Sequence, residues 1–275
     1  MTRFHLPVFK ASPHRSTAEL VRLASHAEEI YERAVADAAS FDFGLALLSN
    51  EFAEIAEANQ VRDVAMVPGI SAAQMAAQVE AAFAARNLTC HEWYFADGKV
   101  PPELRPILEA RGYHLKKANL WVMQHPQNLD VRDDLTIIPG RASHQKLADL
   151  AVATEIAWGT TGPAALAQFR EAAIRYLDDP QVDNLLALSD QTAVGTVYLV
   201  TSGEMGLIID FYVHPSHTRQ KVATTLLDRI IELAHRSLLR HLCLFCDADN
   251  TAARALYQKT GFAEIAEIEW MTLAE

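Results

Sequence analysis

The stretch VHPSHTRQKVATTLL, residues 213–227, leads from a strand-like end through a loop with Pro215 into an apolar helix. Three basic or potentially basic side chains, His217, Arg219 and Lys221, lie where that helix is about to begin. A helix N-terminus exposes N–H groups without intrahelical partners and carries a partial positive charge, so cations are unfavourable there unless an anion binds. The stretch alone fits a phosphate-binding site and a solvated loop with incidental charge about equally.

The composition of the chain restricts its partners. The 275 residues carry a formal net charge of -11, and the pI is about 5.4. Binding to nucleic acid depends on clustered Lys and Arg that contact phosphates, so this charge argues against a nucleic-acid partner. It is compatible with a cationic small substrate. The length favours two domains, and half of the residues are hydrophobic, which is ample for packed cores.

Neither a membrane segment nor a disulfide framework is predicted. No apolar run approaches the roughly 18 residues that span a bilayer, and MTRFHLPVFKASPHRS lacks the apolar block of a signal peptide. We therefore expect a cytoplasmic protein without a membrane partner. The three cysteines, Cys90, Cys243 and Cys246, are too few for a disulfide framework. Cys243 and Cys246 lie three apart in a strand-like segment and point to opposite faces, so we expect no metal or redox pair.

The first half of the chain predicts alternating helices and strands. Ser16 and Glu19 form a capping-box pattern, which opens an Ala-rich helix to about residue 39. The pattern then predicts, in order, a strand at 41–49, a helix capped by Asn50, a helix at 71–86, a strand at 89–95, a helix from Pro101 to Gly112 and a strand or hairpin at 113–124.

A polar segment, HPQNLDVRDD, divides the chain and predicts a first domain at 1–125, a linker at 126–134 and a second domain at 135–275. The order of elements in the second half is typical of an α/β domain. It comprises a strand at 135–139, helices at 145–157 and 163–176, a hairpin at 184–200, a strand at 206–213, the helix of the opening stretch, a strand at 241–246, a helix at 250–260 and a final strand.

A faint internal repeat connects the two halves. ILEARGYHLKKANLWVM, residues 107–123, and LYQKTGFAEIAEIEWMT, residues 256–272, superpose without a gap. The alignment pairs Gly112 with Gly261 and Trp121 with Trp270. Two related domains follow from this repeat, and chance similarity of two helix–Gly–aromatic ends is the alternative.

Two motifs of the second half resemble the Gcn5-related N-acetyltransferase (GNAT) superfamily. NTAARALYQKTGF, residues 250–262, matches the family pattern N-x-x-A-x-x-L-Y-x-x-x-G-F at every fixed position. The opening stretch is similar to the family's acyl-CoA pyrophosphate loop, V-x-P followed by R/Q-x-x-G-x-G/A, although Thr218 replaces Arg or Gln and Lys221 replaces the middle glycine. The resemblance covers residues 132–275 and, weakly, the first half. It implies two tandem α/β domains, each a mixed, mostly antiparallel sheet flanked by helices.

The resemblance also implies which residues bind acetyl-CoA. Backbone N–H groups around Arg219 would hold the pyrophosphate, Val213 would pair with the pantetheine arm, and Asn250 would hydrogen-bond the cofactor. A glycine lets the backbone approach a phosphate closely, so Lys221 puts the loop geometry in question, and its ammonium would instead meet a phosphate directly. The implied cofactor-binding set comprises Tyr212, Val213, Thr218, Arg219, Gln220, Lys221, Val222, Ala223, Thr224, Asn250 and Ala253.

The implied enzyme is an acetyl-CoA-dependent N-acetyltransferase, an acyltransferase without a metal cofactor. By resemblance, Tyr257 would be the general acid for the leaving thiolate, and the amine of a small molecule or peptide would attack directly in a ternary complex. Asp210, Glu204 or a water relayed by either is the candidate base. Strand alternation places Asp210 on the face opposite Val213, and a surface or structural carboxylate is at least as good an interpretation of it. Trp158, Phe169 and Tyr176 lie in the helical segment that commonly walls the acceptor site in this family, and a core position is an equal alternative for each.

Two other hypotheses remain open at this point. One is a non-catalytic acyl-CoA-binding or regulatory module, and the other is an assembly role for the tandem arrangement, with a homodimer among the partners considered. In the first half, Pro101 stands opposite Asn250 and Leu108 opposite Tyr257, and only Gly69 offers a flexible point near a helix start. We therefore expect a degenerate first domain, which shapes the acceptor groove without binding CoA.

Overall fold

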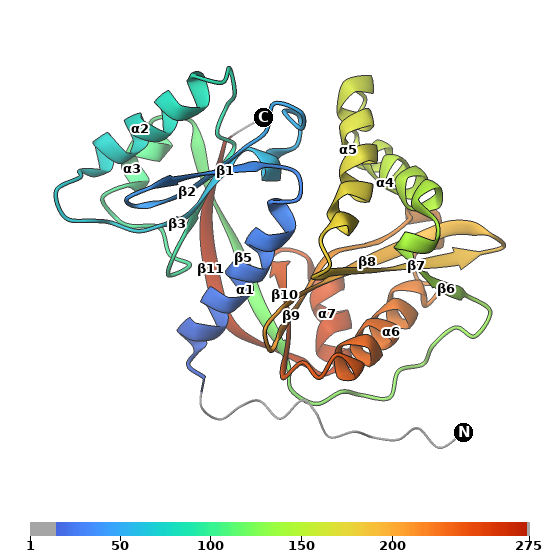
Figure 1. The fold of residues 1–275 in the computed structure, drawn as a ribbon. Coiled ribbons are helices and arrows are strands. Elements are labelled where there is room, and N and C mark those ends of the chain that lie inside the picture. The colour runs from blue at the N-terminus through green and yellow to red at the C-terminus, as the bar shows by residue number, and fades with distance from the viewer. Residues whose placement is uncertain (1–14, 274–275) are drawn as a thin grey trace. The chain divides into compact units, whose positions relative to one another are not determined.

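The computed structural model describes residues 15–273, which form two compact units (Figure 1). Unit 1 comprises residues 15–31 and 119–266, and unit 2 comprises residues 32–118 and 267–273. The units group the chain differently from the expected ranges 1–125, 126–134 and 135–275. Residues 15–31 join the second half of the chain, and residues 267–273 join the first half.

Unit 1 is a mixed α/β layer structure with strand order β5-β10-β9-β8-β7-β6. Strands β9 and β10 pair in parallel, while the pairs β6–β7, β7–β8 and β8–β9 are antiparallel. The elements are α1 (Thr17–Glu32), β5 (Tyr113–Met123), β6 (Thr136–Pro139), α4 (His144–Trp158), α5 (Pro163–Arg175), β7 (Val182–Ser189), β8 (Thr192–Ser202), β9 (Met205–Val213), α6 (Val222–Arg236), β10 (His241–Asp247), α7 (Thr251–Thr260) and β11 (Phe262–Leu273).

Unit 2 is a smaller mixed sheet with strand order β1-β2-β3-β4-β11. Again one pair, β3–β4, is parallel, and the pairs β1–β2, β2–β3 and β4–β11 are antiparallel. Its own elements are β1 (Asp37–Phe41), β2 (Gly44–Leu48), β3 (Gln60–Val64), α2 (Ala72–Ala84), β4 (Glu92–Phe95) and α3 (Arg105–Glu109). The expected fold class, two α/β domains with mixed and mostly antiparallel sheets, is confirmed.

The closing strands β5 and β11 each contribute to both units. Residues 119–123 of β5 belong to unit 1, where β5 is the neighbour of β10. The end of β11 belongs to unit 2, where Trp270 pairs with Tyr94 and Met271 with Trp93. Each half of the chain therefore gives the end of its last strand to the unit that the other half builds.

The internal repeat extends to backbone details that the sequence comparison does not reveal. Gly112 and Gly261, which precede the two closing strands, both have positive φ angles. Asp63 in β3 and Asp210 in β9 are also left-handed, with φ of 53° and 45°. A Cβ on Gly44 would lie 2.7 Å from the Arg62 carbonyl oxygen, which leaves room only for glycine beside this bend.

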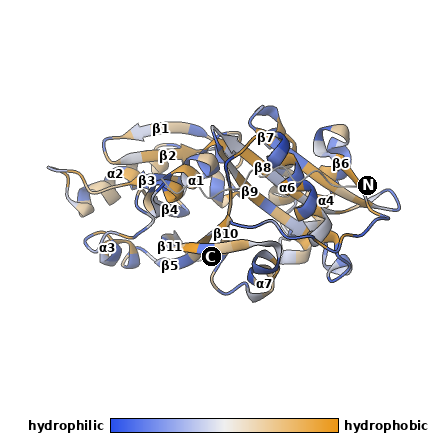
Figure 2. Ribbon diagram, turned by 90° about the horizontal axis from the view of Figure 1, so that it is seen from below, coloured by the Kyte–Doolittle hydropathy of each residue, from blue (hydrophilic) through white to orange (hydrophobic). Residues whose placement is uncertain are grey.

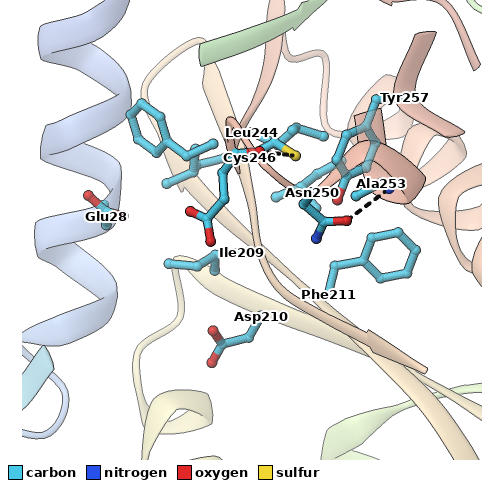
Figure 3. Close-up of a pocket in the computed structure, with 13 residues that line it drawn as sticks. Glu28, Ile209, Asp210, Phe211, Leu244, Cys246, Asn250, Ala253 and Tyr257 are labelled. Atoms are coloured by element: carbon cyan, nitrogen blue, oxygen red, sulfur yellow. Dashed lines mark hydrogen bonds between the residues drawn. The ribbon is translucent and has the colours of Figure 1, made fainter. Parts of the chain in front are cut away.

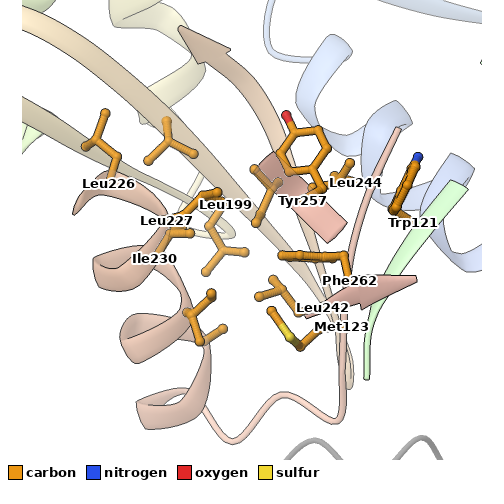
Figure 4. Close-up of a cluster of buried hydrophobic side chains, with 14 of the residues drawn as sticks. Trp121, Met123, Leu199, Leu226, Leu227, Ile230, Leu242, Leu244, Tyr257 and Phe262 are labelled. Atoms are coloured by element: carbon orange, nitrogen blue, oxygen red, sulfur yellow. The ribbon is translucent and has the colours of Figure 1, made fainter. Parts of the chain in front are cut away.

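A large apolar core supports the site-bearing end of unit 1 (Figure 4). Helix α6 contributes one face to it, including Val222, Leu226 and Ile230, with a helical spacing of four residues. Trp121 and Met123 from the end of β5 pack in the same core. In Figure 2 the inner strands β9 and β10 of unit 1 are coloured mostly hydrophobic, as expected for strands that helices cover.

Two predicted elements of the first half are wrong. The first helix ends at Glu32 instead of residue 39, because residues 37–41 pair with β2 as an edge strand. No helix follows Asn50, whose side-chain amide donates to the Arg86 carbonyl, and only turns and a short 3-10 helix at Ala56–Ala58 are found there.

None of the helices in the described part of the chain is long and apolar enough to cross a membrane.

Candidate functional site

A pocket opens where the two parallel strands of unit 1 stop pairing. Strands β9 and β10 pair from Met205–His241 to Ile208–Leu244, and beyond this point their facing edges diverge. An open cavity of about 270 Å³ lies at the divergence, lined by both strands, the start of α7 and Glu28 of α1. The carboxyl ends of parallel strands are the usual place for ligands in α/β folds.

A bulge in β9 directs Asp210 into this pocket. Thr196 of β8 pairs with Tyr212 and Tyr198 pairs with Ile209, so Asp210 and Phe211 together lie opposite a single residue. Val213 packs against the core that contains α6, whereas Asp210 accepts from Tyr31 of α1, so the two side chains lie on opposite faces as strand alternation predicts. Ile209, Asp210 and Phe211 all line the pocket (Figure 3).

The Asp210 carboxylate is held from α1. Oδ2 accepts a hydrogen bond of 2.6 Å from the Tyr31 hydroxyl. The side chain is exposed at the pocket; desolvation raises the pKa of Asp210, the Tyr31 hydrogen bond lowers it and the charge of Glu28 raises it, with a net rise. A carboxylate with a raised pKa in a pocket is suited to accept a proton.

Glu204, the other candidate base, lies at the far end of β9. It stands in the turn before Met205, where that strand begins. Its carboxylate pairs with Arg240 at 2.9 Å and with Arg15 at 3.7 Å, and Glu204 is not among the residues that line the pocket. These positions remove Glu204 from the candidate chemistry.

Helix α7 positions Asn250 and Tyr257 on the opposite wall. Asn250 caps the helix, its Oδ1 accepting from the Ala253 backbone N–H at 3.1 Å, so the amide Nδ2 remains for a ligand. Tyr257 lies about two turns further along α7. Its ring packs against the rings of Trp121, Phe211 and Phe262. Burial raises the pKa of Tyr257, so its hydroxyl keeps the proton at neutral pH. Asn250, Ala253 and Tyr257 all line the pocket.

Two residues of the loop before α6 have the left-handed backbone conformation typical of glycine, although the loop contains no glycine. Arg219 and Lys221 have φ of 59° and 60°, in the left-handed region that favours glycine. No side chain caps α6, so the N–H groups of its first turn, which begins at Val222, are left for another acceptor. Thr218 and Gln220 hydrogen-bond within the loop, to the carbonyls of Pro215 and Ser216.

The Lys221 ammonium has a protein partner. Its Nζ lies 2.6 Å from Asp130 Oδ2, and this contact lowers the pKa of the exposed Asp130 carboxyl. The same polar segment packs against α6 through a hydrogen bond from the Arg132 backbone N–H to Thr225 Oγ1. The segment predicted as a linker therefore lies along the loop and belongs to unit 1.

The predicted site residues thus fall into two groups. Asp210, Asn250, Ala253 and Tyr257 line one pocket. The others are not part of its lining: Tyr212 and Val213 at the end of β9, and Thr218, Arg219, Gln220, Lys221, Val222, Ala223 and Thr224 in the loop and the start of α6. Val213 ends the strand that leaves the pocket, so the second group continues from the first along the chain.

The aromatic residues expected near the acceptor differ in environment. Trp158 is 68% exposed and lies edge-on to Tyr212, with 5.2 Å between the ring centroids. Tyr176 is buried and stacks on Tyr31 at 3.8 Å, so it belongs to the core beneath Asp210. Phe169 is half-buried on α5.

Sequence reasoning missed the contributions of α1 and of Cys246. Glu28 and Tyr31 belong to the first half of the chain, and nothing local in their sequence connects them with a strand in the second half. Cys246 lines the pocket, and burial raises the pKa of its thiol to about 11, while Cys243 is fully buried. Both are free cysteines, and no group of three or more metal-ligating side chains is found within residues 15–273.

Comparison with known proteins identifies the domain that carries this pocket. Residues 146–262 match the family model described as acetyltransferase (GNAT) family. No curated protein matches the sequence. Residues 146–262 are therefore a GNAT-family domain, as the two motifs predict.

Solved structures share the fold over nearly the whole chain. A functionally unknown conserved protein from Staphylococcus epidermidis is 16% identical with a TM-score of 0.62, over 86% of this chain and 93% of that one. A GCN5-related N-acetyltransferase from Kribbella flavida is 15% identical with a TM-score of 0.57, over 94% and 97%. A Drosophila protein is 12% identical with a TM-score of 0.55, over 92% and 89%. At these identities the likeness shows the fold alone.

Proposed function

We propose that this protein, whose residues 146–262 form a GNAT-family domain, transfers an acetyl group from acetyl-CoA to a primary amine of a small molecule or peptide, by direct attack in a ternary complex. The observation that carries this proposal is the pairing of two opposite functions in one pocket. Asp210, a carboxylate with a raised pKa, and Tyr257, a phenol that keeps its proton, line the same cavity. Acyl transfer to an amine needs one group of each kind.

The residues present fit acetyl-CoA, which supplies the thioester that an amine attacks. The edge of β9 that faces β10 is unpaired beyond Ile208, which leaves backbone groups up to Val213 for an extended arm. The uncapped start of α6 and the left-handed Arg219 present N–H groups to a pyrophosphate. Asn250 would contribute its free amide hydrogens.

Each catalytic side chain would move one proton. Asp210 would take the proton of the acceptor ammonium, directly or through a water, and so keep the amine nucleophilic. The Tyr257 hydroxyl would donate its proton to the departing sulfur. Because burial keeps Tyr257 protonated, the donor is ready at neutral pH.

The charge of the pocket favours a cationic acceptor. Three carboxylates, those of Glu28, Asp210 and Asp247, are among the lining residues, and none of the lining side chains in the described part of the chain is basic. An amine that enters as an ammonium gains Coulomb attraction from such a lining. This agrees with the acidic balance of the whole sequence.

We propose further that unit 2 does not bind CoA. Its strands β3 and β4 continue to pair past the left-handed Asp63, since Val64 pairs with Phe95. The Ala96 backbone N–H also donates to the Val64 carbonyl at 3.2 Å. The corresponding strands of unit 1, β9 and β10, no longer pair at this point. The backbone groups that are left for a ligand in unit 1 are therefore hydrogen-bonded between strands in unit 2.

The test of the proposed function is CoA release with a panel of amines, combined with calorimetry. We expect acetyl-CoA to bind with a stoichiometry of one per chain, and CoA to be released with at least one cationic amine. Binding without CoA release from any amine would favour the non-catalytic acyl-CoA-binding alternative. Absence of binding at millimolar acetyl-CoA would contradict both, and two sites per chain would contradict the proposal for unit 2.

A matched pair of glycine variants tests the phosphate loop. Arg219 and Lys221 are both left-handed, so glycine relieves the same backbone strain at either position. No ion pair of Arg219 is found within residues 15–273, whereas Lys221 is paired with Asp130. We expect Arg219→Gly to weaken CoA binding by about tenfold or more, the scale of a lost charged hydrogen bond, and Lys221→Gly to leave it nearly unchanged.

Calorimetry with CoA and with a dephosphorylated pantetheine fragment gives the comparison. The Arg219→Gly effect should appear with CoA and vanish with the fragment. If Lys221→Gly loses as much affinity for CoA as Arg219→Gly does, Lys221 leaves Asp130 to meet a phosphate, as its sequence position suggests.

A further inference from the structure

The hydrogen bond between Tyr31 and Asp210 joins two residues that lie far apart in the sequence. Tyr31 stands in the last turn of α1, and only 3% of it is exposed. Its ring stacks on Tyr176 and meets Tyr198 edge-on at 5.4 Å, so the orientation of the phenol is fixed on two sides. The hydroxyl group then points its O–H at Asp210 Oδ2.

The hydrogen bond from Tyr31 matters because the backbone of Asp210 does not fix the orientation of its carboxylate. The residue lies in the β9 bulge with a left-handed φ of 45°, and its side chain is open to the pocket. A carboxylate in this setting has several rotamers, and a hydrogen bond to one oxygen selects among them. No hydrogen bond to the other oxygen, Oδ1, is found among the described residues, so Oδ1 is available to a substrate.

We propose that Tyr31 is a positioning residue, which holds the Asp210 carboxylate so that Oδ1 faces the acceptor amine. The inference rests on the proposed function, in which Asp210 accepts the proton of the acceptor. It places the first half of the chain in the reaction, through a helix that belongs to unit 1.

The charged and titratable neighbours of Asp210 set the sign of the effect. Desolvation raises the pKa of Asp210, the Tyr31 hydrogen bond favours the ionised carboxylate and lowers it, and Glu28 on the same helix raises it. Burial raises the pKa of Glu155 of α4 and of Tyr198 of β8, and the Asp210 charge raises each further. Loss of the Tyr31 hydroxyl leaves the carboxylate facing only groups that oppose its ionisation, so the pKa of Asp210 should rise.

The experiment compares Tyr31→Phe with Tyr198→Phe in the full-length protein. Both variants remove one buried hydroxyl from the same aromatic cluster, but that of Tyr198 donates to the Ala173 carbonyl. Carbon-13 NMR of labelled aspartate follows the titration of Asp210, assigned by the signal that Asp210→Asn removes. Rates of CoA release with one cationic amine give the pH profile of kcat/KM.

In Tyr31→Phe we expect the Asp210 titration, and the acidic limb of kcat/KM, to move up by about 1 pH unit. We also expect kcat to fall by about tenfold with an unchanged KM for acetyl-CoA. Tyr198→Phe should change neither profile. An Asp210 titration that stays in place in Tyr31→Phe, or moves equally in Tyr198→Phe, would overturn the role of Tyr31. The NMR titration needs no turnover, so a wild-type protein that is inactive with every amine would overturn the proposed function separately.

Discussion

In the Tyr257→Phe variant, kcat for CoA release is expected to fall by about 10²-fold, within the usual range for loss of a general acid. The affinity for acetyl-CoA should change little, because the phenylalanine ring keeps the contacts with Trp121, Phe211 and Phe262. Only the proton donor is removed. Steady-state kinetics with one amine, together with calorimetry of acetyl-CoA binding, separates the two effects.

Tyr113→Phe is the matched control for this loss of a buried hydroxyl. Tyr113 donates to the Cys90 carbonyl at 2.6 Å, in the core of unit 2. Its loss should lower the melting temperature and leave kcat unchanged. If kcat of Tyr257→Phe equals that of the wild type, Tyr257 is a packing residue of the core and another donor protonates the sulfur.

A fragment of residues 132–275 should neither fold as the native unit nor release CoA. It lacks α1 with Tyr31 and the end of β5, which is the neighbour of β10 in the sheet of unit 1. Trp121 and Met123 would be lost from the core, and burying two such side chains contributes about 3–6 kcal/mol. This is a large part of the roughly 5–15 kcal/mol that stabilises a domain. Circular dichroism, size-exclusion chromatography and CoA release give the measurement.

A nicked full-length chain distinguishes lost elements from a broken chain. A protease site inserted after the exposed Asn128 cuts the segment between β5 and β6 but keeps both pieces. We expect the cleaved protein to stay folded and active. A 132–275 fragment that acetylates amines as fast as the full chain would show that the first half has no part in the chemistry.

The sequence predicts the second half of the chain well, because its signals are local there. Gly261 ends α7 with a φ of 101°, in the left-handed region where glycine commonly ends a helix. In the first half, the local signal of the Ser16 and Glu19 capping box is likewise confirmed, since both of its hydrogen bonds form. Such features depend on neighbouring residues and can be read without knowledge of the fold.

The errors occur where distant residues determine local structure. Strand β3 is not predicted, because Gln60 and Arg62 interrupt its apolar pattern. Both are buried, and Arg62 is neutralised by Glu32 at 2.6 Å and covered by the Tyr94 ring at 4.6 Å. Asp210 is similar, since a bulge and a partner in α1 decide where its carboxylate points. Contacts between residues that lie far apart in the sequence produce no local sequence pattern from which they could be predicted.

The exchange of the closing strands has a consequence for the order in which the protein can fold during synthesis. Unit 2 needs residues 267–273, which leave the ribosome after all its other strands, so its sheet stays unfinished while the whole of unit 1 is made. Helix α1 is likewise made long before its partner strand β9, since Tyr31 and Asp210 are 179 residues apart in the sequence. Contacts between such distant segments are slow to form. The nascent chain therefore carries an open sheet edge for most of its translation, when pairing with another chain is a hazard.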